Sequence, residues 1–180
     1  MSAAPRTAEA TDTTGLQRQA PFEGYSHQPR PLGEYGVLVA TFATAFSVIT
    51  AAARRRGRLP EEVGAGDIVL LGVATHKLSR LLAKDKVTSV VRAPFTRREG
   101  SGAAAEVEEE PRGRGPRYAI GELLVCPFCL AQWVAAAFVQ GLLFAPRVTR
   151  VVAGMFSIVA VSDFLQVAYK AAENRMSADE

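Results

Sequence analysis

Two long stretches without a charged residue constrain the fold of this chain more than any other feature. Residues 35–53 form an uncharged run of 19 residues, and residues 123–145 form one of 23. A helix of 19 residues is about 28 Å long, close to the hydrocarbon thickness of a bilayer, which is about 30 Å. We therefore expect both stretches to be solvated by lipid and to cross a membrane.

The apolar and charged residues are segregated along the chain instead of being mixed at helical period. The chain is 48% hydrophobic with a net charge of +3, and its basic residues flank apolar blocks without interleaved aromatic residues. Anionic lipid is the expected counter-charge, so we predict the lipid bilayer as a partner and no nucleic acid. Residues 1–34 contain no apolar stretch typical of a signal peptide. Insertion then relies on internal segments, and we expect a multi-pass protein of the cell membrane.

We predict an all-α fold, a multi-pass membrane bundle of three to four helices. The membrane domain covers residues 35–172, and the polar arm before it, residues 1–34, is predicted to be disordered. A connection rich in Gly, Arg and Glu, residues 99–117, predicts a flexible loop. Residues 173–180 form a tail. The predicted helices cover about residues 35–54, 66–84, 122–145 and 148–171.

The second apolar segment, residues 67–82, fits two placements. His76, Arg80 and Lys84 are four residues apart on one helical face, with Lys77 beside them. Such a stripe fits a short spanning helix whose cations reach the headgroups, or a helix that lies in the interface. The interfacial placement puts 16 Lys and Arg residues on one side of the membrane and 5 on the other. Four spans put 13 on one side and 6 on the other, with Lys77 and Arg80 inside the bilayer. Because the segment is just long enough to cross, both placements stay open.

Cys126 and Cys129 form a Cys-Pro-Phe-Cys sequence at the start of the third segment, and the chain has no other cysteine. If a helix begins near Cys126 with Pro127 in its first turn, both sulfurs lie near one face of that turn, where the helix dipole favours a thiolate. This arrangement is typical of redox-active dithiols. Two thiolates also supply half of a zinc shell, with His76 or a second copy of the chain as sources of further ligands. In the third interpretation both cysteines pack as small apolar side chains.

Charged side chains inside the apolar segments form a second candidate site. Asp163 lies about four turns into the last segment, where an unpaired charge is costly. We expect it to pair with Lys77 or Arg80, and we expect Glu122 to anchor Arg80 or to cap the third helix. A structural ion pair that locks the bundle is favoured over a proton or ion relay, because one carboxylate and a few cations make a poor pathway.

The runs at residues 74–97 and 121–134 resemble a known family. Their K-L-S-R-L helix, the basic connection and the C-P-x-C-x-x-x-W motif are similar to the bacterial membrane-protein family catalogued as domain of unknown function 1360, over about residues 67–169. Some members of that family are linked to sporulation. The resemblance implies an integral membrane protein without an assigned activity, and it supplies no catalytic residues.

Three functions follow from these features. We expect a non-enzymatic structural or interaction module that packs with a second copy of itself or with another membrane protein. The alternatives are a membrane thiol–disulfide or zinc site at Cys126 and Cys129, and a component of a small ion or proton transporter that uses Asp163. The sequence predicts no catalytic residue and no cofactor.

Overall fold

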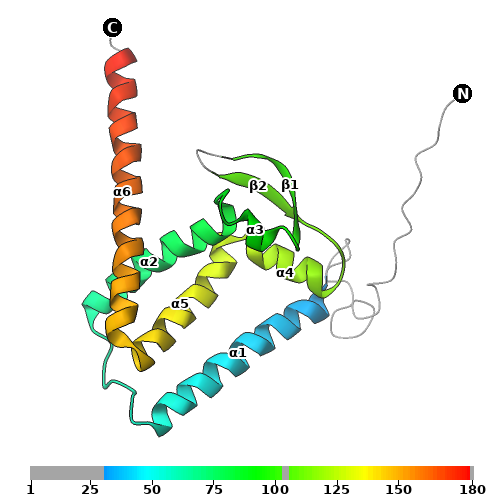
Figure 1. The fold of residues 1–180 in the computed structure, drawn as a ribbon, viewed down its shortest axis with the longest axis vertical. Coiled ribbons are helices and arrows are strands. Elements are labelled where there is room, and N and C mark those ends of the chain that lie inside the picture. Colours follow the sequence, from blue (N-terminus) through cyan, green and yellow to red (C-terminus); the bar gives the residue numbers. More distant parts are fainter. Residues whose placement is uncertain (1–30, 103–105, 179–180) are drawn as a thin grey trace, which may run out of the picture.

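The computed structural model describes residues 31–102 and 106–178. Within these ranges the chain forms helices and one small antiparallel sheet (Figure 1). Residues 1–30 of the arm predicted to be disordered lie outside the described residues, and residues 32–34 of that arm belong to the first helix. In chain order the elements are α1 (Leu32–Arg55), α2 (Ala65–Lys84), α3 (Ser89–Arg92), β1 (Thr96–Ser101), β2 (Val107–Pro111), α4 (Pro116–Val125), α5 (Pro127–Phe144) and α6 (Pro146–Ala178).

The long helices run between two ends of the molecule, which we call the hairpin end, where β1 and β2 lie, and the turn end, where α5 meets α6 (Figure 1). α1 and α5 run from the hairpin end to the turn end. At the hairpin end, the Tyr35 hydroxyl donates a hydrogen bond to the Glu122 carboxylate of α4. At the turn end, Arg58 Nη1 donates to the Phe144 carbonyl oxygen at 2.9 Å.

α2 and α6 lie side by side and run in the opposite direction, toward the hairpin end. They begin together at the Asp67–Arg150 ion pair (2.7 Å), and Ser157 Oγ donates to the Leu70 carbonyl oxygen at 2.9 Å further along. α2 has 20 residues and α5 has 18, so both are about 30 Å long at about 1.5 Å per residue. α2 therefore connects the same two ends as α5.

The apolar core is small and lies where α2, α5 and α6 meet. It is built from Leu71, Ala74, Val134, Phe138 and Ala153. Within residues 31–102 and 106–178, three helices, α1, α5 and α6, are long and apolar enough to cross a membrane, and most of their surface is exposed. Large apolar surfaces of this kind are typical of contact with lipid. The prediction of a multi-pass membrane helical bundle is confirmed, and the small sheet is the one departure from an all-α fold.

α1 contacts the rest of the bundle mainly through α5. The Phe42 ring meets the Trp133 ring edge-on, with 5.2 Å between the ring centroids. Deeper toward the turn end, the buried Gln140 donates a hydrogen bond from Nε2 to Thr50 Oγ1 at 2.9 Å. Hydrogen bonds between polar side chains hold helices together in lipid, so this hydrogen bond, the ring contact and the hydrogen bond from Tyr35 to Glu122 attach α1 along its length.

The helix predicted at residues 122–145 is two helices in the structure. α4 ends at Val125, Cys126 is extended (φ −101°, ψ 103°), and α5 begins at Pro127. Proline has no N–H to continue the helix from α4, but its fixed φ suits the first position of α5. The last helix is longer than predicted. It continues to Ala178, past the predicted end at residue 171, because the predicted tail contains no Gly or Pro to stop it.

The connection predicted to be flexible, residues 99–117, contains regular structure instead. β1 and β2 pair as an antiparallel hairpin, with Arg97 opposite Glu110 and Arg98 opposite Glu109, and a bulge follows Arg98. Composition alone indicates a solvated linker because the segment is charged and poor in apolar residues. In the hairpin, however, the acidic run faces the arginines, and opposite charges across a ladder stabilise it.

We predict that α2 crosses the membrane beside α5 and α6. In a background with Cys126→Ser and Cys129→Ser, single cysteines are introduced at the exposed Glu62, between α1 and α2, and at the exposed Glu99 of β1. A membrane-impermeant thiol reagent should label the two positions from opposite sides of oriented vesicles. Labelling of both from the same side would show that α2 lies in the interface.

Candidate charged cleft and thiol pair

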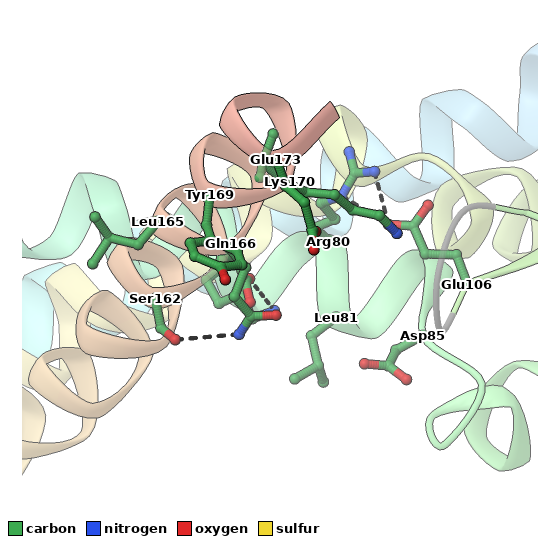
Figure 2. Close-up of a pocket in the computed structure, with 13 residues that line it drawn as sticks. Arg80, Leu81, Asp85, Glu106, Ser162, Leu165, Gln166, Tyr169, Lys170 and Glu173 are labelled. Carbon is green, nitrogen blue, oxygen red and sulfur yellow. Dashed lines mark hydrogen bonds and ion pairs between the residues drawn. The ribbon is translucent and has the colours of Figure 1, made fainter. Parts of the chain in front are cut away.

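A cleft of about 880 Å³ lies between the second half of α2 and the C-terminal half of α6, at the hairpin end (Figure 2). Glu106, which directly precedes β2, borders it from the side of the hairpin. We call this site the charged cleft, because acidic and basic side chains alternate around it. Its charged residues are Lys77, Arg80, Asp85, Glu106, Asp163, Lys170 and Glu173.

α6 turns a polar face toward the charged cleft. The polar residues that line it recur at spacings of three or four, which places them on one side of the helix. Val161, Ala168 and Ala172 fall on the opposite side and are exposed. The polar residues other than Asp163 are exposed as well, and Leu165, Val167 and Tyr169 line the cleft among them, so this half of α6 borders an open site of mixed polar and apolar character. The polar residues are Ser162, Asp163, Gln166, Lys170 and Glu173.

Two ion pairs form the inner walls of the charged cleft. Lys77 Nζ lies 2.6 Å from Asp163 Oδ2, and the Lys77 side chain is only 18% exposed. The sequence left both Lys77 and Arg80 open as partners of Asp163. Arg80 instead turns to the hairpin, where its Nη2 lies 2.7 Å from Glu106 Oε1, as Figure 2 shows.

Three further charged side chains of the charged cleft, Asp85, Lys170 and Glu173, form no ion pair within the described ranges. Asp85 accepts only a backbone hydrogen bond, from the Val87 N–H at 3.3 Å. Lys170 and Glu173 extend from α6 toward the side of Arg80 and Glu106 (Figure 2). The charged cleft thus combines two pre-formed ion pairs with charges of both signs that are available to a ligand.

Glu122 and His76 lie away from the positions expected for them. Glu122 accepts the hydrogen bond from Tyr35 of α1, so its partner is not Arg80. The His76 ring stacks on the Phe164 ring of α6, with 6.1 Å between centroids. Neither Glu122 nor His76 forms a group of three possible metal ligands with the cysteines among the described residues.

The hairpin that borders the charged cleft is held by the buried Arg92, a residue that the sequence analysis missed. The Arg92 side chain is fully buried, and its Nε and Nη2 atoms donate to the two carboxylate oxygens of Glu109 at 2.9 and 3.0 Å. Its Nη1 and Nη2 atoms also donate to the carbonyl oxygens of Leu82 (2.7 Å) and Asp85 (3.0 Å), at the end of α2. One guanidinium therefore connects α2 to β2. Sequence spacing gives no sign of this pair, because it depends on the register of the hairpin.

Glu109 is correspondingly held in its charged form. Burial raises the pKa of this carboxyl group, but hydrogen bonds from Arg92, Thr96 and Ser89, together with the Arg92 charge, outweigh burial and lower the pKa below its usual value near 4.5. Thr96 Oγ1, for example, donates to Glu109 Oε2 at 2.7 Å. A buried carboxylate with this many donors is a structural anion.

Cys126 and Cys129 lie at the hairpin end, where α4 meets α5. Cys126 is the N-cap of α5, and its Sγ accepts the N–H of Cys129 at 3.2 Å. Pro127 therefore lies in the first turn of α5, the condition under which the sequence placed both sulfurs near one face of that turn. Both thiols are free; Cys126 is half-buried, Cys129 is exposed, and Phe128 between them is 89% exposed. The exposure of Cys129 gives no support to the interpretation that both cysteines pack in a core.

The chain is similar to proteins of unknown function. The family model described as "Protein of unknown function (DUF1360)" matches residues 70–169, as the K-L-S-R-L helix and the C-P-x-C motif led us to expect. The protein named UPF0713 protein YngL from Bacillus subtilis (strain 168) is 27% identical over 101 residues, which cover 56% of this chain and 75% of that protein. No solved structure matches the chain.

We predict that docking of the hairpin is lost in acid because Glu109 must then be protonated. A carboxyl group with a lowered pKa stabilises the fold at pH values above its unfolded pKa, and this contribution disappears as the pH falls below about 4.5 and through the lower folded pKa. The measurement is hydrogen exchange of the β1 and β2 amides in detergent, corrected for the intrinsic rate at each pH.

Two variants test whether Glu109 itself causes the loss of hairpin docking in acid. Glu109→Gln should open the hairpin already at neutral pH, because removing one partner of a buried ion pair costs about 3–5 kcal/mol. Glu110→Gln is the matched control, since the Glu110 side chain is 43% exposed and its carboxylate lies 3.6 Å from the Arg97 guanidinium. It should keep the wild-type pH dependence. An acid transition that persists in Glu109→Gln would contradict the assignment.

Proposed function

Since the chain belongs to the DUF1360 family, whose description assigns no activity, we propose from its own geometry that it is a non-enzymatic membrane module that binds a polypeptide segment in the charged cleft. The observation that carries this proposal is the lining of the charged cleft. Charged side chains of both signs lie there together with apolar side chains, and Asp85, Lys170 and Glu173 form no ion pair within the described ranges. A cleft with this lining offers both charged and apolar contacts to a ligand.

The charges of the site favour a polypeptide over a simple anion. A phosphate or lipid headgroup is bound by cations concentrated at one point, whereas the charged cleft carries three basic and four acidic side chains. Apolar surface from Leu81, Leu165 and Tyr169 lies among them. Complementary charges of both signs set the register and choice of a protein partner. A segment with charges of both signs and an apolar side chain fits this lining.

The distribution of basic residues supports a cytoplasmic position for the hairpin end. Positive residues are retained on the cytoplasmic side of membrane proteins, and eleven of those described lie at or near the hairpin end against six at the turn end. The first group is Arg80, Lys84, Lys86, Arg92, Arg97, Arg98, Arg112, Arg114, Arg117, Lys170 and Arg175, and the second is Arg54, Arg55, Arg56, Arg58, Arg147 and Arg150. The charged cleft then opens toward the cytoplasm and the cell membrane is the natural location.

Transport is less well supported by the same geometry. A transported ion would need a polar path from the charged cleft to the turn end. Between these two places α2, α5 and α6 meet in the apolar core around Leu71, Val134 and Phe138. The ion pair of Lys77 and Asp163 closes the inner end of the charged cleft, which supports a role in packing.

We predict that a polypeptide can be cross-linked in the charged cleft. A photoreactive amino acid at Tyr169, which lines the cleft, is activated in native membranes, and the adduct is identified by mass spectrometry. Lys170→Glu should reduce the adduct at least several-fold, because it reverses one uncommitted charge of the site.

Arg175→Glu provides the matched control. Arg175 lies on the same helix, is exposed and does not line the charged cleft, so its reversal should leave the adduct unchanged. Circular dichroism of both variants checks that the helices persist. Equal loss in the two variants, or an adduct with lipid alone, would rule out a polypeptide site here.

A further inference from the structure

The spacing of the two cysteines matches one half of a tetrahedral metal shell. They are separated by two residues, the spacing of paired thiolate ligands in structural zinc sites. Both are free, and neither is fully buried. The Cys126 Sγ atom is fixed at the first turn of α5 by the N–H of Cys129 at 3.2 Å, and backbone donors of this kind stabilise the thiolate that binds a metal.

The described part of one chain does not complete this shell. Zinc in structural sites is almost always bound by four ligands, and no group of three or more His, Cys, Asp and Glu side chains is placed to hold a metal within residues 31–102 and 106–178. His76, the histidine within these ranges, is held against Phe164. The two further ligands must therefore come from residues outside these ranges, where His27 lies, or from another molecule.

The surroundings favour a second copy of the same chain. Phe128, between the cysteines, is 89% exposed, which leaves a large apolar ring beside two unused thiols. In a two-fold symmetric contact each chain offers the same patch, so two copies bring together four thiols and two Phe128 rings. The hairpin end is the side that we place in the cytoplasm, where thiols stay reduced and paired cysteines more often bind metal than form disulfides.

We propose that two copies of this protein share one Zn²⁺ ion, bound tetrahedrally by Cys126 and Cys129 of each copy. The ion is structural, since all four positions are taken by thiolates and none is open to a substrate. Four zinc–sulfur bonds of about 2.3 Å would fix the two α5 helices side by side at their first turns. The site is separate from the charged cleft, so each proposal can fail without the other.

The test uses the full chain purified in detergent and loaded with Zn²⁺ or with Co²⁺. The expected result is one metal ion per two chains, an absorption spectrum of Co²⁺ with four thiolates, and the mass of a dimer by light scattering. A chelator should convert the dimer to monomers, and Co²⁺ should restore it. This measurement on the unmodified chain holds even if a cysteine variant fails to fold.

Cys126→Ser and Cys129→Ser should each abolish the metal and the dimer. Ala131→Ser is the control, because it introduces a serine two positions further along α5 without touching the pair. Four results would overturn the proposal: one metal ion per chain, no bound metal, a dimer whose mass does not change on chelation, or a Cys126–Cys129 disulfide trapped by alkylation in native membranes.

Discussion

The buried contact of Arg92 with Glu109 is the interaction on which the hairpin end of the structure depends. It joins the end of α2 to β2, and the same guanidinium donates to the carbonyl oxygens of Leu82 and Asp85 and to the Thr88 hydroxyl group. Through the hairpin it also fixes Glu106, and through Glu106 the orientation of Arg80. A buried pair of this kind contributes little net stability compared with an apolar contact. Its contribution is to specify one position for a segment whose composition would otherwise leave it free.

α2 is the helix that distinguishes this bundle from a set of independent spans. Unlike α1, α5 and α6, it is not apolar enough to stand out as a membrane span, yet it lies between α5 and α6 and provides much of the core. Its charged residues are compensated one by one: Asp67 by Arg150, Lys77 by Asp163, and Arg80 by Glu106. Charges that would be expensive in lipid are therefore directed to neighbouring helices and to the hairpin.

The sequence predicted what depends on local composition and missed what depends on register. Uncharged runs of helical length located α1 and α5, because lipid solvation is a local constraint. The predicted helix at residues 122–145, however, passed through Pro127, where the structure ends α4 and begins α5. The hairpin was not predictable, since its charges are stabilised by residues on another strand and by Arg92. For the candidate sites, the sequence named Lys77, Asp163 and the cysteines. It did not find Lys170, Glu173 or Glu106, which are brought together by the way α6 lies against α2.

The attachment of α1 has a consequence for the order of assembly. Its contacts with the bundle are few, an edge-on ring contact at Phe42 and polar contacts at Tyr35 and Thr50. Independent insertion followed by lateral docking is the general route for membrane helices. During synthesis α1 emerges first and must wait in lipid for Glu122 and Gln140 to appear about 90 residues later. This separation makes its docking a late event, and the completed bundle is the first species in which the Gln140 amide nitrogen has its hydrogen-bond partners on α1.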